Sequence, residues 1–220
     1  IFVDSKTKRI SAFPKTTRIA AMTDDVFYIY YGTWDGKVIK FNKKTFVSSL
    51  VASADNSLEF QDIIVKNKVI YAATTKVLLI CSESRYKLIK PVEKGAGSYL
   101  LSLLNHPEYG ILIGNKTGEI FRYNEDLETF EIFYKDELNS SIASMLNDQH
   151  GNIWINTFAG IVAFDPKNNN HIRFTSEDGL SNSEANRHSA FKASTNHFLV
   201  GSVSGINYFH PDSLYKEQLN

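Results

Sequence analysis

Trp34 and Asp35 stand next to each other in a short polar stretch ahead of Gly36, and their residue types suggest ligand binding. An exposed indole ring can stack on the apolar face of a sugar, and a carboxylate beside it can accept hydrogen bonds from sugar hydroxyl groups. We therefore take Trp34 and Asp35 as candidate ligand contacts. The alternative is that both residues only shape a turn.

A second set of candidates lies in the polar segment 176–187, SEDGLSNSEANR, and in the residue after it. Its carboxylate, amide, guanidinium and imidazole groups could bind the polar groups of a ligand. The candidate contacts are Glu184, Asn186, Arg187 and His188. The alternative is a structural clamp, in which Asn and Asp side chains bond the loop backbone and Arg187 bridges two structural units.

The elements that must position these residues are short strands, because the chain repeats a four-strand pattern. A small or polar residue after the second strand marks the period, with separations of 41, 41, 42 and 45 residues. These markers are Gly32, Ala73, Gly114, Asn156 and Gly201. The segments are short, rich in β-branched and aromatic residues and bounded by turn residues, and no longer window shows a helical period. This is the period and strand number of a β-propeller blade.

We therefore predict an all-β fold, a single fragment of about five four-stranded antiparallel blades cut from a larger β-propeller. Residues 1–13 are expected to end a preceding blade. The expected blades are residues 14–53, 54–94, 95–136 and 137–178, with an incomplete, three-stranded last blade at 179–220. Glycines should form the turns between second and third strands with positive φ. They are Gly36, Gly118, Gly160 and Gly205.

Antiparallel topology divides the candidates between two faces. Turns between second and third strands emerge on the same face as the connections between blades, so Trp34 and Asp35 should share a face with segment 176–187. His106, His150 and His197 fall in turns on the opposite face, one in each of three successive blades. We expect them to be solvated and too far apart to share an ion, so we predict no metal and no cofactor.

Composition excludes several function classes. The 220 residues are 43% hydrophobic, which suffices for a core, and 24 basic residues balance 24 acidic ones. A neutral chain argues against nucleic-acid binding and against contact with an anionic membrane, and no apolar run approaches the ~20 residues of a membrane span. The only cysteine, Cys81, lies in the apolar run VLLIC and is expected to be a buried structural thiol. Because the first residue is Ile1, we expect a piece of a longer chain.

Two repeats resemble a known family. GNIWINTFAGIVAFDPKNNNHIRFTSEDGL (151–180) is similar to the regulator-propeller repeat of the hybrid two-component sensor histidine kinases of Bacteroidetes, with Asn156 where Gly is usual and Ile161 where Leu is usual. Segment 179–214 resembles the last blade of that propeller. Its matching residues are Asn186, Arg187, Gly201, Gly205, Asn207, Phe209 and Pro211. The other repeats match only at hydrophobic positions and at glycines.

The resemblance implies a function that composition and spacing do not. It implies a non-catalytic, periplasmic sensor module that binds an oligosaccharide or a partner domain. The parent would be a homodimeric histidine kinase anchored in the inner membrane. Two alternatives remain: a propeller that serves as a protein-interaction scaffold, and a propeller glycosidase or lyase. The last needs carboxylates that converge on the axis, and the carboxylates of the first strands show no such shared register. They are Asp24, Asp25, Glu59, Asp62 and Asp148.

Overall fold

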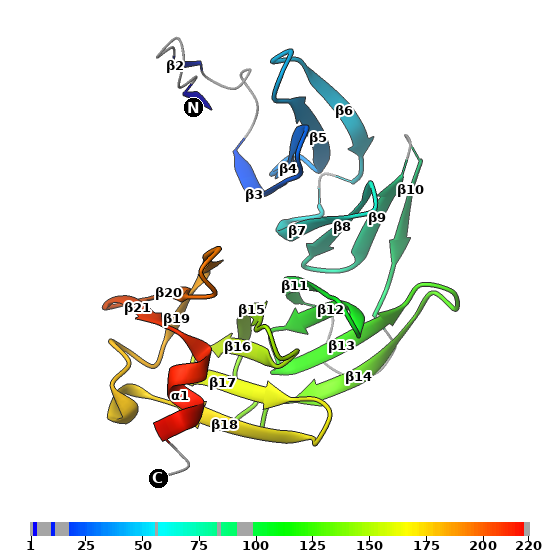
Figure 1. Cartoon of the computed structure of the whole chain (residues 1–220). Helices are drawn as coiled ribbons and strands as arrows, with labels where there is room; N and C mark the ends of the chain where they lie inside the picture. Colours follow the sequence, from blue (N-terminus) through cyan, green and yellow to red (C-terminus); the bar gives the residue numbers. More distant parts are fainter. Residues whose placement is uncertain are drawn as a thin grey trace.

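The computed structural model describes residues 2–3, 10–11, 18–55, 57–82, 85–91 and 99–217 of the chain. These residues form twenty-one strands, one 3₁₀ helix and one α-helix, and all strand pairs are antiparallel. Figure 1 shows the sheets as blades placed in an arc around a common axis. The predicted all-β propeller fold is confirmed.

Four blades are four-stranded meanders whose first strand lies nearest the axis (Figure 1). Blade 1 consists of β3 (Ile19–Asp24), β4 (Tyr28–Thr33), β5 (Lys37–Asn42) and β6 (Ser48–Ser53). Blade 2 consists of β7 (Phe60–Lys66), β8 (Val69–Thr74), β9 (Leu78–Ser82) and β10 (Arg85–Ile89). Blade 3 consists of β11 (Leu100–His106), β12 (Gly110–Asn115), β13 (Glu119–Asn124) and β14 (Thr129–Lys135). Blade 4 consists of β15 (Ile142–Asn147), β16 (Ile153–Thr157), β17 (Gly160–Asp165) and β18 (Asn170–Phe174).

Blade 5 has three strands, and a helix follows it. The strands are β19 (Ala185–Lys192), β20 (Phe198–Ser202) and β21 (Gly205–Phe209), preceded by the 3₁₀ helix η1 (Ser176–Asp178). The helix α1 (Pro211–Glu217) follows the third strand, at the point in the chain where the other blades have a fourth strand. Two short strands, β1 (Phe2–Val3) and β2 (Ile10–Ser11), pair with each other; the rest of the expected blade remnant 1–13 lies outside the described residues.

The core consists of four apolar clusters, one between each pair of successive blades. A single meander exposes both faces, and stacking against a neighbour on each side buries both. Cys81 lies in the cluster between blades 1 and 2 and is fully buried, and this burial raises the pKa of its thiol to about 12. Trp154 is fully buried between blades 4 and 5, where its indole N–H donates to a carboxylate oxygen of Asp148 at 3.1 Å. The prediction that Cys81 is a buried structural thiol is confirmed.

The first strands pack against one another around the axis: β3 on β7, β7 on β11, β11 on β15 and β15 on β19. All four glycines expected in the turns between second and third strands have positive φ, from 75° at Gly36 to 155° at Gly205. In blade 2 Thr75 and Lys76 take this place, and the Thr74 N–H donates to the Val77 carbonyl at 3.0 Å. The repeat therefore sets the scaffold, and the axis is where side chains from different blades meet.

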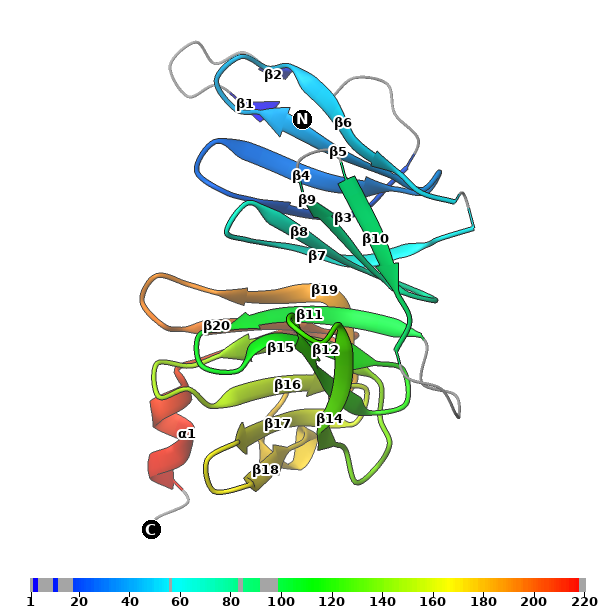
Figure 2. The same ribbon diagram turned by 90° about the vertical axis from the view of Figure 1, so that its right-hand side faces the viewer.

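The helix α1 is fastened to blade 4, as Figure 2 shows at the edge of the molecule. Pro211 begins the helix, where its missing N–H costs nothing. The carboxylate of Asp212 accepts a hydrogen bond from the side-chain amide of Gln149 at 2.8 Å and lies 3.0 Å from Nε2 of His150. The helix is only seven residues long, which is too short for a periodic pattern to reveal it.

Candidate functional site

The first strand of blade 5 is more irregular than those of the other four blades. In blade 1 the pairing passes from Ile19 opposite Thr33 to Ala21 opposite Gly32, which leaves one extra residue. The same single irregularity occurs in blades 2, 3 and 4. In blade 5 the pairing jumps from Ala185 opposite Ser202 to Ala190 opposite Val200. Bulges of this kind redirect side chains, and they are frequent beside functional sites.

This bulge, residues 186–189, contains three of the candidate residues. His188 has a positive φ of 58°, an uncommon conformation for a residue other than glycine. Gly201 lies opposite the bulge, and a Cβ atom there would come within 2.8 Å of the Cβ of Ser189. The close approach explains why a glycine occupies position 201.

A cavity of about 370 Å³ opens where the bulge faces blades 1, 2 and 3. We call it the mouth cavity. Its aromatic and polar lining includes Arg18, Trp34, Gln61, Tyr99, Arg187 and His188. Trp34 and Arg187 therefore share a face of the propeller, as the topology predicted.

The mouth cavity adjoins a second cavity of about 460 Å³ along the axis, lined by residues of all five first strands. We call it the axial cavity. His188 lines both cavities, and Asp62 lines the axial one. Of the five first-strand carboxylates considered as catalytic candidates, only Asp62 lines the axial cavity, which agrees with the absence of a shared inward register. The Asp62 side chain faces the axis because both its oxygens accept backbone hydrogen bonds there, from Leu103 at 2.7 Å and from Ile63 at 2.8 Å.

The charge of Arg187 affects the pKa values of two other side chains of these cavities, His188 and Asp62. The Arg187 guanidinium donates to the side-chain oxygen of Gln61, and its Nη2 lies 3.5 Å from Nε2 of His188. Partial burial, and then the charge of Arg187, lower the pKa of His188. Burial raises the pKa of Asp62 to about 6, although its two backbone hydrogen bonds and Arg187 oppose the shift. At neutral pH the imidazole is therefore neutral, and most of the Asp62 side chains are ionised.

Trp34 is half exposed at the wall of the mouth cavity, and its ring interacts with the cationic side chain of Arg18. The guanidinium carbon of Arg18 lies 4.3 Å from the centroid of the Trp34 ring, within the range of a cation–π interaction. The backbone N–H of Trp34 donates to the carbonyl of Arg18 at 2.9 Å. These two contacts hold the turn of blade 1 against the chain that enters its first strand.

The other three candidates lie outside the lining of the mouth cavity. Asp35 accepts a hydrogen bond from Thr33 and pairs with Lys37, so it stabilises its own turn. The amide of Asn186 donates to the Ser202 carbonyl at 2.8 Å, and Glu184 is exposed.

Segment 176–187 also forms the structural clamp that is the alternative to ligand binding. Thr175 and Asp178 close a capping box around η1, and the Ser181 N–H donates to the side-chain oxygen of Asn207 at 2.7 Å. Arg187 bridges blades 5 and 2 through Gln61. Arg187 therefore belongs both to the clamp and to the lining of the cavity.

The expectation of three solvated histidines was wrong for His106. Its side chain is buried, Nδ1 accepts backbone hydrogen bonds from Glu108 and Tyr109, and Nε2 lies 3.1 Å from the Gly151 carbonyl of the next blade. Burial lowers its pKa. The turn packs against the neighbouring turn, which a reading of isolated turns does not reveal. Within the described ranges, no group of His, Cys, Asp and Glu has the geometry of a metal site.

Sequence reasoning missed Arg18, Gln61 and Tyr99. A signal for two of them exists in the repeat. In blades 1, 2, 3 and 5 the carbonyl of the residue before the first strand accepts a hydrogen bond from the turn after the second strand; Trp34 donates to Arg18, and Lys116 donates to Tyr99. Aligning the repeats at this position would have placed both residues on the face that carries Trp34.

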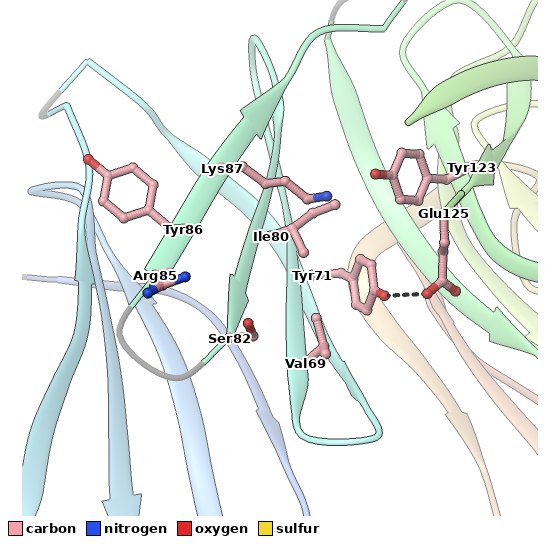
Figure 3. A pocket seen from close by; sticks show the side chains of 9 residues that line it. All are labelled: Val69, Tyr71, Ile80, Ser82, Arg85, Tyr86, Lys87, Tyr123 and Glu125. Carbon is pink, nitrogen blue, oxygen red and sulfur yellow. Dashed lines mark hydrogen bonds between the residues drawn. The ribbon is translucent and has the colours of Figure 1, made fainter. Parts of the chain in front are cut away.

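A third cavity, of about 310 Å³, lies between blades 2 and 3 (Figure 3). Figure 3 shows Tyr71 pointing at Glu125, whose carboxylate accepts the Tyr71 hydroxyl at 3.0 Å, and Lys87 pointing toward Tyr123. Glu125 also pairs with Lys66 at 2.5 Å. Because the Glu125 carboxylate already interacts with these side chains of the protein, this groove is a weaker candidate for a ligand site than the mouth cavity.

Comparisons with known proteins place this geometry in context. No protein-family profile matches the chain. A sequence relative is histidine kinase P4 of Formosa agariphila, 21% identical over 99% of this chain, which spans only 18% of that protein. No helix in the described part of the chain is long and apolar enough to cross a membrane.

Solved structures from Bacteroides thetaiotaomicron have the same fold. The extracellular domain of BT4673 superposes with a TM-score of 0.75 and 18% identity, covering 91% of this chain and 28% of that chain. The extracellular domain of BT3049, assigned to a hybrid two component system, superposes with a TM-score of 0.65 and 16% identity, covering 96% of this chain and 36% of that one.

An enzyme also has this fold. Virginiamycin B lyase of Staphylococcus aureus superposes with a TM-score of 0.74 at 9% identity, covering 89% of this chain and 68% of the lyase. The fold by itself therefore does not distinguish sensing from catalysis. The two sensor ectodomains are more similar in sequence than the lyase. The chain has the β-propeller fold of hybrid two-component sensor ectodomains, and its resemblance to the regulator propeller of those sensors is confirmed at the level of the fold.

Proposed function

We propose that this chain is the extracytoplasmic sensor module of a hybrid two-component signalling protein and that it binds an oligosaccharide in the mouth cavity without catalysing a reaction. The observation that carries the proposal is the convergence of Trp34, Arg187 and His188 from opposite ends of the arc on one cavity. The similarity to a histidine kinase and to sensor ectodomains supports it. The module would lie in the periplasm, in a homodimeric parent anchored in the inner membrane.

The position of the cavity suggests how binding would be transmitted. Its lining comes from blades 1, 2, 3 and 5, so a bound ligand contacts both ends of the arc at once. A ligand shifts a conformational equilibrium only by its difference in affinity for the two states, and a contact across blades supplies such a difference. Blade 5 leads directly into α1, so a shift of blade 5 would be passed toward the parts of the parent that follow.

Isothermal titration calorimetry of the purified chain against a panel of neutral and acidic oligosaccharides tests the proposal. We expect saturable binding to at least one oligosaccharide. The Trp34→Ala variant should bind it at least about tenfold more weakly, a loss of about 1.4 kcal/mol. Tyr86→Ala, which alters an exposed tyrosine of the groove between blades 2 and 3, is the control and should bind normally. Equal losses in both variants, or no binding by any oligosaccharide, would contradict the proposal.

Two other functions have an observation in their favour. Ile206 and Tyr208 are more than three-fifths exposed on β21, which suits a protein-interaction surface. Asp62 and His188 line the axial cavity of a fold that a lyase shares, which suits acid–base catalysis. Incubating the chain with each oligosaccharide and analysing the products by mass spectrometry distinguishes catalysis from binding, because a sensor returns its ligand unchanged.

A further inference from the structure

We propose that the mouth cavity selects sugars that carry an anionic group, a carboxylate or a sulfate ester, and that Arg187 and Arg18 bind this group. The inference rests on the proposed function and names the class of its ligand. It follows from the hydrogen bonds and ion pairs that the two arginines form and lack within the described residues.

Arg187 has hydrogen-bonding capacity that the protein does not use. Its Nη2 is engaged by Gln61, but its Nε is buried and has no hydrogen-bond partner among the described residues. Leaving a buried donor unsatisfied costs ~1–3 kcal/mol, and an acceptor brought by a ligand recovers this cost if the Arg187 side chain turns its Nε into the mouth cavity. A guanidinium presents its N–H groups as a planar fork that fits the oxygens of a carboxylate or sulfate.

Arg18 is exposed, and its partner is an aromatic ring instead of a carboxylate. Its guanidinium lies over Trp34 at 4.3 Å, and no described acidic side chain pairs with it. The indole can hold this cation at the cavity wall without neutralising it. Trp34 is then a positioning residue for Arg18, in addition to offering apolar surface to a sugar ring.

Two other cationic side chains of the protein are neutralised by ion pairs with carboxylates. Arg173 pairs with the buried carboxylate of Asp136, and Lys66 pairs with Glu125. Within the described residues neither arginine of the mouth cavity forms such an ion pair, although the charge of Asp62 acts on Arg187 from the axial cavity.

The balance of charge at the cavity favours an anion. Glu59 also lines it, so its lining holds two guanidinium groups and one carboxylate. The whole chain has no net charge, with 24 basic and 24 acidic residues. The positive excess is therefore confined to the lining of the mouth cavity, with the Asp62 carboxylate in the adjoining axial cavity, and it attracts anionic ligands at short range.

Two matched ligand pairs test the proposal by calorimetry. One pair is a uronic-acid oligosaccharide and its carboxyl-reduced form, and the other is a sulfated oligosaccharide and its desulfated form. We expect the charged member of at least one pair to bind ten times or more tightly than its neutral partner, with the advantage shrinking as salt is raised. The pair that shows the difference identifies carboxylate or sulfate as the recognised group.

Three variants locate the effect. Arg187→Gln and Arg18→Gln should each remove most of the affinity advantage of the charged ligand over its neutral partner. Arg122→Gln is the matched control, because Arg122 is an exposed arginine paired with Glu131 on β14, and it should have no effect. Because Arg187 also joins two blades, Arg18→Gln provides a test that does not depend on that contact.

Each outcome decides a different claim. If the neutral members bind as tightly as the charged ones, the ligand class is wrong while the sensor function stands. An equal loss in Arg122→Gln would mean attraction by overall charge, which also overturns the proposal. If neither member of either pair nor any sugar of the wider panel binds, the proposed sensor function fails as well.

Discussion

The guanidinium of Arg187 in blade 5 donates a hydrogen bond to the side-chain oxygen of Gln61 in blade 2, across 126 positions of sequence. Blades 2 and 5 are not neighbours, because the first strand of blade 2 packs on the first strands of blades 1 and 3. The contact therefore joins two separated parts of the arc at the mouth cavity. A ligand that competes for Arg187 would change this connection.

Replacing Gln61 with Ala should lower the free energy of unfolding by about 1–3 kcal/mol. Gln61 is buried, and its loss leaves the Arg187 guanidinium with a second unmet donor. Chemical denaturation measures the loss. The control is Gln149→Ala, whose exposed amide bonds Asp212 and should change stability by no more than about 0.5 kcal/mol. Similar stabilities for wild type and Gln61→Ala would show that the contact does not hold the blades.

The difference in stability between wild type and the Asp62→Asn variant should depend on pH. The folded state raises the pKa of Asp62 from 3.8 to about 6, so the folded protein holds its proton more tightly than the unfolded chain. Stability from this group is thus present at low pH and is lost as pH rises through about 6, with an upper bound of about 3 kcal/mol.

Thermal melts of wild type and Asp62→Asn between pH 4 and pH 8 test this sign. Relative to wild type, the variant should gain stability as pH rises from 4 to 7, because asparagine has no charge to bury. Asparagine also gives up one of the two acceptors used by Leu103 and Ile63, which lowers stability equally at every pH. A difference between the two proteins that does not vary with pH, or that varies in the opposite direction, would refute the raised pKa.

Gly160→Ala should be strongly destabilising. Gly160 has a φ of 111°, and an added Cβ would lie 2.3 Å from the backbone oxygen of Phe174. Strain costs ~1–3 kcal/mol and overlap in a packed region a further ~1–3 kcal/mol. The matched control is Gly179→Ala, where φ is 98° but no atom lies within 4 Å of the added Cβ. Differential scanning calorimetry should show a melting temperature clearly lower for Gly160→Ala; equal values would contradict the overlap.

The two tryptophans should differ in how much stability is lost when each is replaced by phenylalanine. Trp154→Phe removes a buried hydrogen bond to Asp148 and leaves a void, so we expect a loss of about 2–4 kcal/mol. Trp34→Phe alters a half-exposed ring and should cost no more than about 0.5 kcal/mol. Urea denaturation measures both. A large loss in Trp34→Phe would mean that the ring is part of the core.

The sequence predicted the scaffold well because the scaffold is periodic. The marker residues predicted the repeat, and the parity of antiparallel strands placed Trp34 and Arg187 on one face. It did not predict Gln61, because the contact of Gln61 with Arg187 depends on the bulge at 186–189 and on how blades curve around the axis. Burial of a turn residue such as His106 depends on the neighbouring blade, which local patterns do not show.

The most direct test of the central claim is the response of the two indole N–H signals in a ¹H–¹⁵N correlation spectrum as an oligosaccharide is added. The chain has two tryptophans; Trp34 lines the mouth cavity and Trp154 is fully buried between blades 4 and 5. With an anionic oligosaccharide that binds in calorimetry, the Trp34 signal should move in a saturable way while the Trp154 signal stays in place. Saturable binding that leaves the Trp34 signal unmoved would contradict the assignment of the mouth cavity as the ligand site.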